Sequence, residues 1–197
     1  LTSGLNLIGI ENHEVPLVQF LLQIKGGMLL ENTTKIGVSN MLAELMTQGT
    51  KNKTPEQLEN AIESLGATIK AYSTDEGIFI SGNSLAKNYK ATIALVEEII
   101  LQPRWDLKEF DLIKQSTLSQ IQQQKADPNS IARNEFKKLI YGKESILSYN
   151  RSGDENSVKN ITIDDLKKYY TSNFSPSVSI FQIVGAVSKN EVTNSLI

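Results

Sequence analysis

GVSNMLAELMTQGTKNKT, residues 37–54, is the segment that decides how this chain folds. With Ile36 just before it, the segment carries apolar residues at helical spacing, which predicts a helix that ends near residue 46. Inside that helix Asn40 and Glu44 stand one turn apart, and Ala43 directly precedes Glu44. A short turn, Gly49 to Thr54, then leads into the next helical pattern.

Periodicity and turn residues predict the other elements outward from this segment. Strands are expected at residues 5–11, 17–25, 67–73, 77–82 and 178–184. Helices are expected at residues 36–46, 54–65, 85–101, 107–126, 128–141 and 163–170, with a last helix from Ser188. Residues 142–156 are expected to form a loop. The order β-β-α-α-β-β-α-α-α-α-β-α predicts an α+β fold, with helices packed on one face of a mostly antiparallel sheet.

The composition excludes several classes of function. A chain of 197 residues with 40% hydrophobic content can bury the core of one domain. A net charge of −2 argues against a nucleic-acid partner, because phosphate binding needs a clustered basic surface. No apolar run is long enough to span a membrane. With no cysteine and a single histidine, His13, the chain cannot build a zinc site from thiolates or from two imidazoles.

The segment at 37–54 resembles the metal-binding helix of the pitrilysin/insulinase family of zinc metallopeptidases, which includes the mitochondrial processing peptidases. In the family signature H-x-x-E-H, two histidines bind zinc and the glutamate activates water. The matching residues here are Asn40, Ala43 and Glu44. The resemblance covers nearly the whole chain, through four further segments at residues 4–27, 54–82, 95–115 and 155–187.

The third zinc ligand of the family is a glutamate on a later helix, in a segment resembling L-x-E-I. Leu118-Ser119-Gln120-Ile121 matches it and places Gln120 at the ligand position, 76 residues after Glu44. The resemblance therefore implies that the scaffold is kept while the ligands and the base are absent. We expect no cofactor in this chain, no hydrolysis of peptides by this domain alone, and zinc in an active partner domain or subunit.

Two weaker metal hypotheses each have a simpler alternative. Glu44 and the nearby amides could hold a hard cation such as calcium, but such ions take six or more oxygen ligands. A hydrogen-bonded polar cluster in place of the metal is the simpler expectation. His13 could reach a metal of another domain, and the simpler expectation is a solvated histidine in a polar turn.

The resemblance also implies a substrate-binding strand. In the family the matching strand lies at a sheet edge and accepts the substrate backbone as an added strand. The residues concerned are Ala67, Thr68, Ile69, Lys70, Ala71, Tyr72 and Ser73. The alternative is an ordinary hairpin strand whose edge is covered. Trp105 could anchor a partner or pack on its own core.

We interpret residues 1–197 as a single inactive-peptidase αβ domain of a longer polypeptide, with the last helix cut short at Ile197. Its expected partners are an active H-x-x-E-H domain or subunit and an extended peptide, which the two would enclose together. Two other classes stay open: a structural subunit like the core proteins of the cytochrome bc1 complex, and a peptide-binding module without proteolysis. A bacterial periplasm or cell envelope is the expected location, and the mitochondrial matrix is the alternative.

Overall fold

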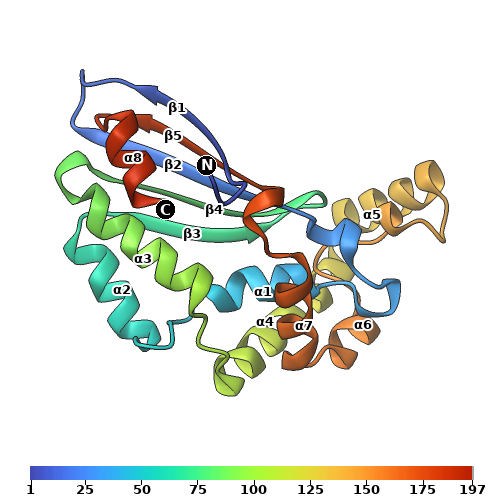
Figure 1. Ribbon diagram of the computed structural model, residues 1–197. Coiled ribbons are helices and arrows are strands. Elements are labelled where there is room, and N and C mark those ends of the chain that lie inside the picture. Colours follow the sequence, from blue (N-terminus) through green and yellow to red (C-terminus); the bar gives the residue numbers. More distant parts are fainter. Residues whose placement is uncertain (197) are drawn as a thin grey trace.

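The computed structural model describes residues 1–196, which form a mixed sheet with helices on one face (Figure 1). The strands are β1 (Asn6–Glu11), β2 (Leu17–Lys25), β3 (Thr68–Ser73), β4 (Gly77–Leu85) and β5 (Ser179–Gly185). Their order across the sheet is β1-β5-β2-β4-β3, so β1 and β3 are the edges. β1 and β5 run parallel, and the other three pairings are antiparallel. The predicted α+β class with a mostly antiparallel sheet is confirmed.

Local capping signals set most helix starts. The helices are α1 (Val38–Met46), α2 (Pro55–Ser64), α3 (Tyr89–Leu101), α4 (Leu107–Ala126), α5 (Pro128–Tyr141), α6 (Glu155–Asn160), α7 (Ile163–Asn173) and α8 (Lys189–Ser195). Short 3-10 turns are η1 (Gly27–Leu30), η2 (Thr33–Lys35), η3 (Ala86–Asn88), η4 (Ile146–Ser148) and η5 (Pro176–Val178). Side chains that accept a backbone N–H at the start of α2, α4, α5, α7 and α8 are Thr54, Asp106, Asp127, Thr162 and Ser188.

β1 and β2 follow each other in the chain but do not pair, because β5 lies between them. The bounds of three segments differ from the sequence prediction. β4 continues through Gly82 to Leu85, so α3 begins at Tyr89 rather than at residue 85. The predicted loop ends earlier, because Asp154 caps α6. α7 extends to Asn173. The expectation about Ile197 lies outside the described residues.

Gly82 shows why β4 passes a residue that signals a strand end. A Cβ at this position would meet the Thr68 carbonyl and the ring of Phe20. The glycine therefore lets β3 and the β2 side chain approach the β4 backbone closely. The residue belongs to the strand interior for a packing reason, not a turn.

The core lies between the sheet and the helices. Alternate residues of β2 are buried against the helices: Val18, Phe20, Leu22 and Ile24. α1 is the central helix, and seven of its 9 residues are buried. It packs against β3 above and against α4 and α7 below (Figure 1). This position brings the decisive segment of the sequence next to the edge strand β3.

Candidate functional site

The start of α1 is fixed by a glycine and a distant carboxylate. Gly37, the N-cap, has a φ of 116°, which favours glycine. The Glu31 carboxylate accepts hydrogen bonds from the backbone N–H of Gly37 at 2.8 Å and of Ser39 at 2.5 Å. Burial raises the pKa of Glu31, and the hydrogen bonds from Ser39 and Gly37 oppose that rise. A carboxylate at the positive end of the helix dipole thus anchors α1.

The three motif positions on α1 form a polar pair and a core contact. Asn40 Nδ2 donates a hydrogen bond to Glu44 Oε1 at 2.9 Å, as their spacing of one turn permits. Burial raises the pKa of the half-buried Glu44, and the bond from Asn40 opposes the rise. Ala43, at the position of the family's general base, is 0% exposed and belongs to the hydrophobic core. A methyl group there cannot accept a proton.

Gln120 lies on α4, which packs against α1. Its side chain is exposed, whereas its neighbours Thr117 and Ile121 are buried. Within residues 1–196 no hydrogen bond joins Gln120 to α1. The structure therefore brings Asn40 and Glu44 together and places Gln120 on the adjacent helix without a direct link to them.

The donors present do not fit zinc. The Glu44 carboxylate accepts a hydrogen bond from the Asn40 amide nitrogen, and neutral amides are poor zinc ligands. No group of three or more His, Cys, Asp or Glu that could hold a metal occurs in the described chain. The calcium hypothesis gains nothing either, because the Asn40 amide turns a donor nitrogen, not an oxygen, toward Glu44. No catalytic step through a metal follows from these residues.

Strand β3 is tied to α1 through its last residue. Ser73 Oγ lies 2.8 Å from Ser39 Oγ in a buried hydrogen bond. The Ser73 carbonyl accepts a bond from Arg151 Nη1 at 2.9 Å. The ring of Tyr72 stacks on Phe79, with centroids 5.3 Å apart. In the part of the chain that is described, the outer edge of β3 has no strand partner.

The predicted edge residues divide between the two faces of β3. Thr68, Lys70 and Tyr72 are exposed, and Ile69 and Ala71 are half-buried and pack against the core. Ala67 precedes the strand and is buried. The sequence offered no signal for Arg151, which reaches β3 from a loop 78 residues further along the chain. The sequence offered no signal for Glu31 either, because its hydrogen bonds to the start of α1 depend on the fold of η1 and η2.

His13 and Trp105 occupy ordinary positions. His13 Nε2 lies 2.8 Å from Glu11 Oε1, and both side chains are exposed. The Trp105 ring packs edge-on against Tyr170, with centroids 5.5 Å apart, at the border of the core. Trp105 therefore packs on its own domain, the simpler of the two expectations.

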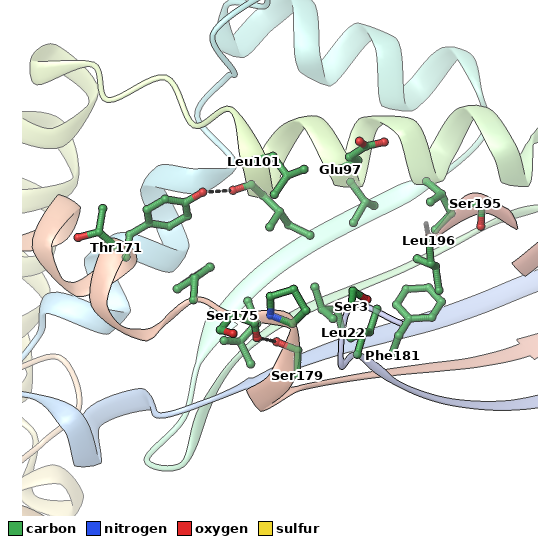
Figure 2. A pocket seen from close by; sticks show the side chains of 18 residues that line it. Ser3, Leu22, Glu97, Leu101, Thr171, Ser175, Ser179, Phe181, Ser195 and Leu196 are labelled. Carbon is green, nitrogen blue, oxygen red and sulfur yellow. Dashed lines mark hydrogen bonds between the residues drawn. The ribbon is translucent and has the colours of Figure 1, made fainter. Parts of the chain in front are cut away.

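A separate cavity of about 480 Å³ lies between the sheet and helices α3 and α7 (Figure 2). Its wall is mostly apolar and includes Leu22, Val96 and Phe181. Two hydrogen bonds satisfy polar groups of the lining residues. Tyr170 Oη donates to the Ile100 carbonyl at 2.7 Å, and Ser179 Oγ donates to the Ser175 carbonyl at 2.7 Å. No residue of α1 or β3 lines it, so it is distinct from the candidate site.

Comparison with known proteins places these observations in a family. The sequence model of "Insulinase (Peptidase family M16)" matches residues 7–147. The "Non-peptidase homolog YmxG" of Helicobacter pylori is 21% identical over 164 residues, which cover 83% of this chain and 38% of that protein. The "Probable mitochondrial-processing peptidase subunit beta, mitochondrial" of Arabidopsis thaliana is 20% identical over 196 residues, 100% of this chain and 37% of that protein.

A solved structure shares the fold. The peptidase M16 inactive domain from Pseudomonas fluorescens superposes with a TM-score of 0.89 at 21% identity, covering 98% of this chain and 47% of that one. This chain thus spans less than half the length of these proteins. None of the helices in residues 1–196 combines the length and apolar character needed to cross a bilayer.

Proposed function

Because this chain belongs to the insulinase family of peptidases (family M16), we propose that it is a non-catalytic domain that helps an active, zinc-bearing domain or subunit bind and enclose extended peptides. One observation carries the proposal. The helix that bears the degenerate motif positions is joined by the Ser39–Ser73 hydrogen bond to an edge strand without a strand partner in the described chain. In this proposal, the loss of the metal ligands leaves the edge of β3 available to pair with a peptide.

Backbone pairing explains how β3 could bind peptides of different sequence. At a sheet edge, alternate residues direct their N–H and C=O groups outward, where an extended peptide can pair with them. The exposed side chains of Thr68, Lys70 and Tyr72 lie on one face of β3, beside the position of the added strand. They would modulate which peptide sequences are preferred, while the backbone hydrogen bonds supply most of the affinity.

The partner supplies the chemistry that α1 lacks. Asn40, Ala43 and Glu44 provide neither a zinc site nor a base, so zinc and the activation of water belong to an H-x-x-E-H domain or subunit. A relative named a subunit of a processing peptidase and a solved "inactive domain" both support a divided architecture. The location follows the partner: a cell envelope if the host is bacterial, the mitochondrial matrix if it is not.

Peptide hydrolysis tests the proposal. The chain and an H-x-x-E-H protein encoded with it are assayed separately and mixed, with zinc and with a chelator. Hydrolysis by the mixture alone, abolished by the chelator, is the expected result. Full activity of the H-x-x-E-H protein alone would leave this chain a structural subunit or a peptide-binding module. Chelator-sensitive hydrolysis by this chain alone would overturn the proposal.

Modified peptides test the binding mode without altering the protein. Two copies of a bound peptide carry N-methyl groups on either the odd or the even amides. Only one set of amides can face β3, so one copy should lose affinity and the other should keep it. Loss of three hydrogen bonds of about 1 kcal/mol each corresponds to roughly a 100-fold weaker Kd. Equal binding of both copies would exclude strand addition.

A further inference from the structure

The outer edge of β3 presents a definite set of backbone groups. In the β3–β4 hairpin the Thr74 N–H donates to the Gly77 carbonyl at 2.8 Å, so this pair closes the ladder. Bonded and unbonded pairs alternate along two antiparallel strands, which assigns the hydrogen bonds with β4 to Thr68, Lys70 and Tyr72. The residues between them turn their N–H and C=O groups toward the edge: Ile69, Ala71 and Ser73.

Both ends of this edge are closed by the protein itself. At the start, the Ala67 N–H donates to the Ile62 carbonyl at 3.2 Å. At the end, the outward Ser73 carbonyl accepts a hydrogen bond from Arg151 Nη1 at 2.9 Å. The guanidinium therefore stands where the N–H of a pairing strand would stand. A peptide added along β3 pairs with the middle of the strand and then meets Arg151.

The turn that carries Arg151 is fixed against α4 and against the residue before α1. Asn150 Nδ2 donates to Gln124 Oε1 on α4 at 3.1 Å, and the Gly153 N–H donates to the Asn150 carbonyl at 2.8 Å. Gly153 has a φ of 77°, and a Cβ at this position would meet the Ile36 carbonyl. Because the turn is held and its arginine already bonds to β3, the guanidinium needs little further ordering to bind a ligand.

The guanidinium keeps donors for such a ligand. The Arg151 side chain is 47% exposed, and within residues 1–196 its only hydrogen bond is the one to Ser73. Of the two acidic residues in the neighbouring turn, Asp75 and Glu76, only Asp75 forms an ion pair with Arg151 in the described chain. Its Oδ1 lies 4.0 Å from Nε, beyond hydrogen-bond distance, and an exposed pair of this length contributes little. The planar fork of an arginine matches the two oxygens of a carboxylate.

On the basis of the proposed function, in which peptides pair with β3, we propose that the Ser73 end of this strand is a carboxylate-binding site and that Arg151 determines which peptides are preferred. Arg151 takes the outward acceptor at this end, and the groups left for a ligand are donors, namely the guanidinium and the Ser73 N–H. A peptide that runs parallel to β3 brings its C-terminal carboxylate to this end. A peptide that runs antiparallel brings its N-terminal half, where an acidic side chain supplies the carboxylate.

Competition between three pools of random heptapeptides tests the proposal. All are built from uncharged residues: one pool has acetyl and amide caps, one has a free C-terminal carboxylate, and one is capped but contains a single aspartate or glutamate. Equal amounts are passed together over the immobilised chain, and mass spectrometry measures the peptides retained. At least one carboxylate pool should be retained about 10-fold more than the fully capped pool, as a charge-assisted hydrogen bond predicts. The pool that is enriched identifies the source of the carboxylate.

Substitutions at Arg151 separate recognition of the carboxylate from support of the fold. Arg151→Gln should abolish the preference while the fully capped pool is retained at least as well as before. Arg151→Lys keeps the charge but not the planar fork, and should keep a preference above that of Arg151→Gln. Arg133→Gln, at another exposed arginine, on α5, removes the same charge and should leave the preference unchanged. Circular dichroism verifies that each variant is folded.

Equal retention of all three pools by the unaltered chain would overturn the carboxylate site and leave peptide binding in place. A preference that survives in Arg151→Gln would assign the carboxylate to another residue and reject the proposal. If Arg151→Gln weakens the retention of all pools alike, Arg151 supports the end of β3 without selecting peptides, and the proposal fails as well. Retention of no pool beyond that of a bare support would instead refute the proposed pairing with β3, and this site with it.

Discussion

Substitution of Ala43 by glutamate would show whether the position of the catalytic base is closed by the core. The side chain is 0% exposed, so Ala43→Glu adds a methylene and a carboxyl group, four heavy atoms in all, to packed surroundings. Overpacking costs about 1–3 kcal/mol. A buried carboxyl without hydrogen-bond partners adds about 1–3 kcal/mol. The free energy of unfolding should therefore fall by about 4 kcal/mol, a large part of the 5–15 kcal/mol typical of a domain.

The penalty should grow with pH. Burial raises the pKa of the introduced carboxyl in the folded state above its unfolded value of about 4.3. The folded state then holds the proton more tightly, so stability falls as pH rises through the interval between the two pKa values, by up to about 1.4 kcal/mol per pH unit. Urea unfolding at pH 5 and pH 8, followed by the fluorescence of the single tryptophan, measures both effects.

Ala43→Met is the matched control, because it adds a similar length without an ionisable group. It should lose only the packing part, about 1–3 kcal/mol, with no added dependence on pH. A loss below about 1 kcal/mol for Ala43→Glu at both pH values would refute the reasoning. It would mean that position 43 opens on a solvated space able to hold a carboxylate, as in an active peptidase.

Substitutions at three further positions test contacts around the site. Glu31→Ala removes both hydrogen bonds at the start of α1 and should lower the free energy of urea unfolding by about 2 kcal/mol, whereas Glu31→Gln, which keeps one acceptor, should lose less. Glu98 binds Lys53 at 2.6 Å; its pKa is lowered by Lys53 and other hydrogen-bond donors despite an opposing effect of burial. That stabilisation is therefore present above the unfolded pKa and lost as pH falls through the folded pKa. Glu98→Gln should flatten this acid limb in thermal melts from pH 3 to 7, and an unchanged limb would contradict the assignment. Gly82→Ala should lower the free energy of unfolding by more than about 2 kcal/mol, because its methyl group would meet the Thr68 carbonyl; a neutral result would show that β3 can move aside.

The sequence predicted the elements that depend on local signals. Thr54 and Asp127 each accept a backbone N–H at the start of the helix that their residue types indicate. The strand order could not be predicted in the same way. Insertion of β5 between β1 and β2 joins residues more than 150 positions apart, such as Phe20 and Ile183, and no local pattern encodes such a pairing.

In the candidate site, too, local contacts could be predicted from the sequence and contacts between distant elements could not. Spacing alone predicted that Asn40 and Glu44 would share a helical face, and a hydrogen bond joins them. The direction of Gln120 depends on how α4 rotates against α1, which is set by the packing of Thr117 and Ile121. Arg151 depends on the path of a loop that has no regular pattern. Contacts within one turn of a helix were predictable, and contacts between elements were not.

The replacements at the motif positions also explain how the scaffold can stay stable without a metal. Unpaired zinc ligands in a protein interior would leave polar groups without partners, which destabilises the folded state. Here Asn40 bonds to Glu44, and Ala43 adds its methyl group to the core. The two polar side chains are thus paired within α1 and Ala43 is accommodated in the core, so the Asn40 and Glu44 side chains keep a partner without a bound ion. Under the proposed function, changes that abolish catalysis fall on α1 and changes that abolish peptide binding fall on β3, so the first can accumulate while the edge of β3 remains intact.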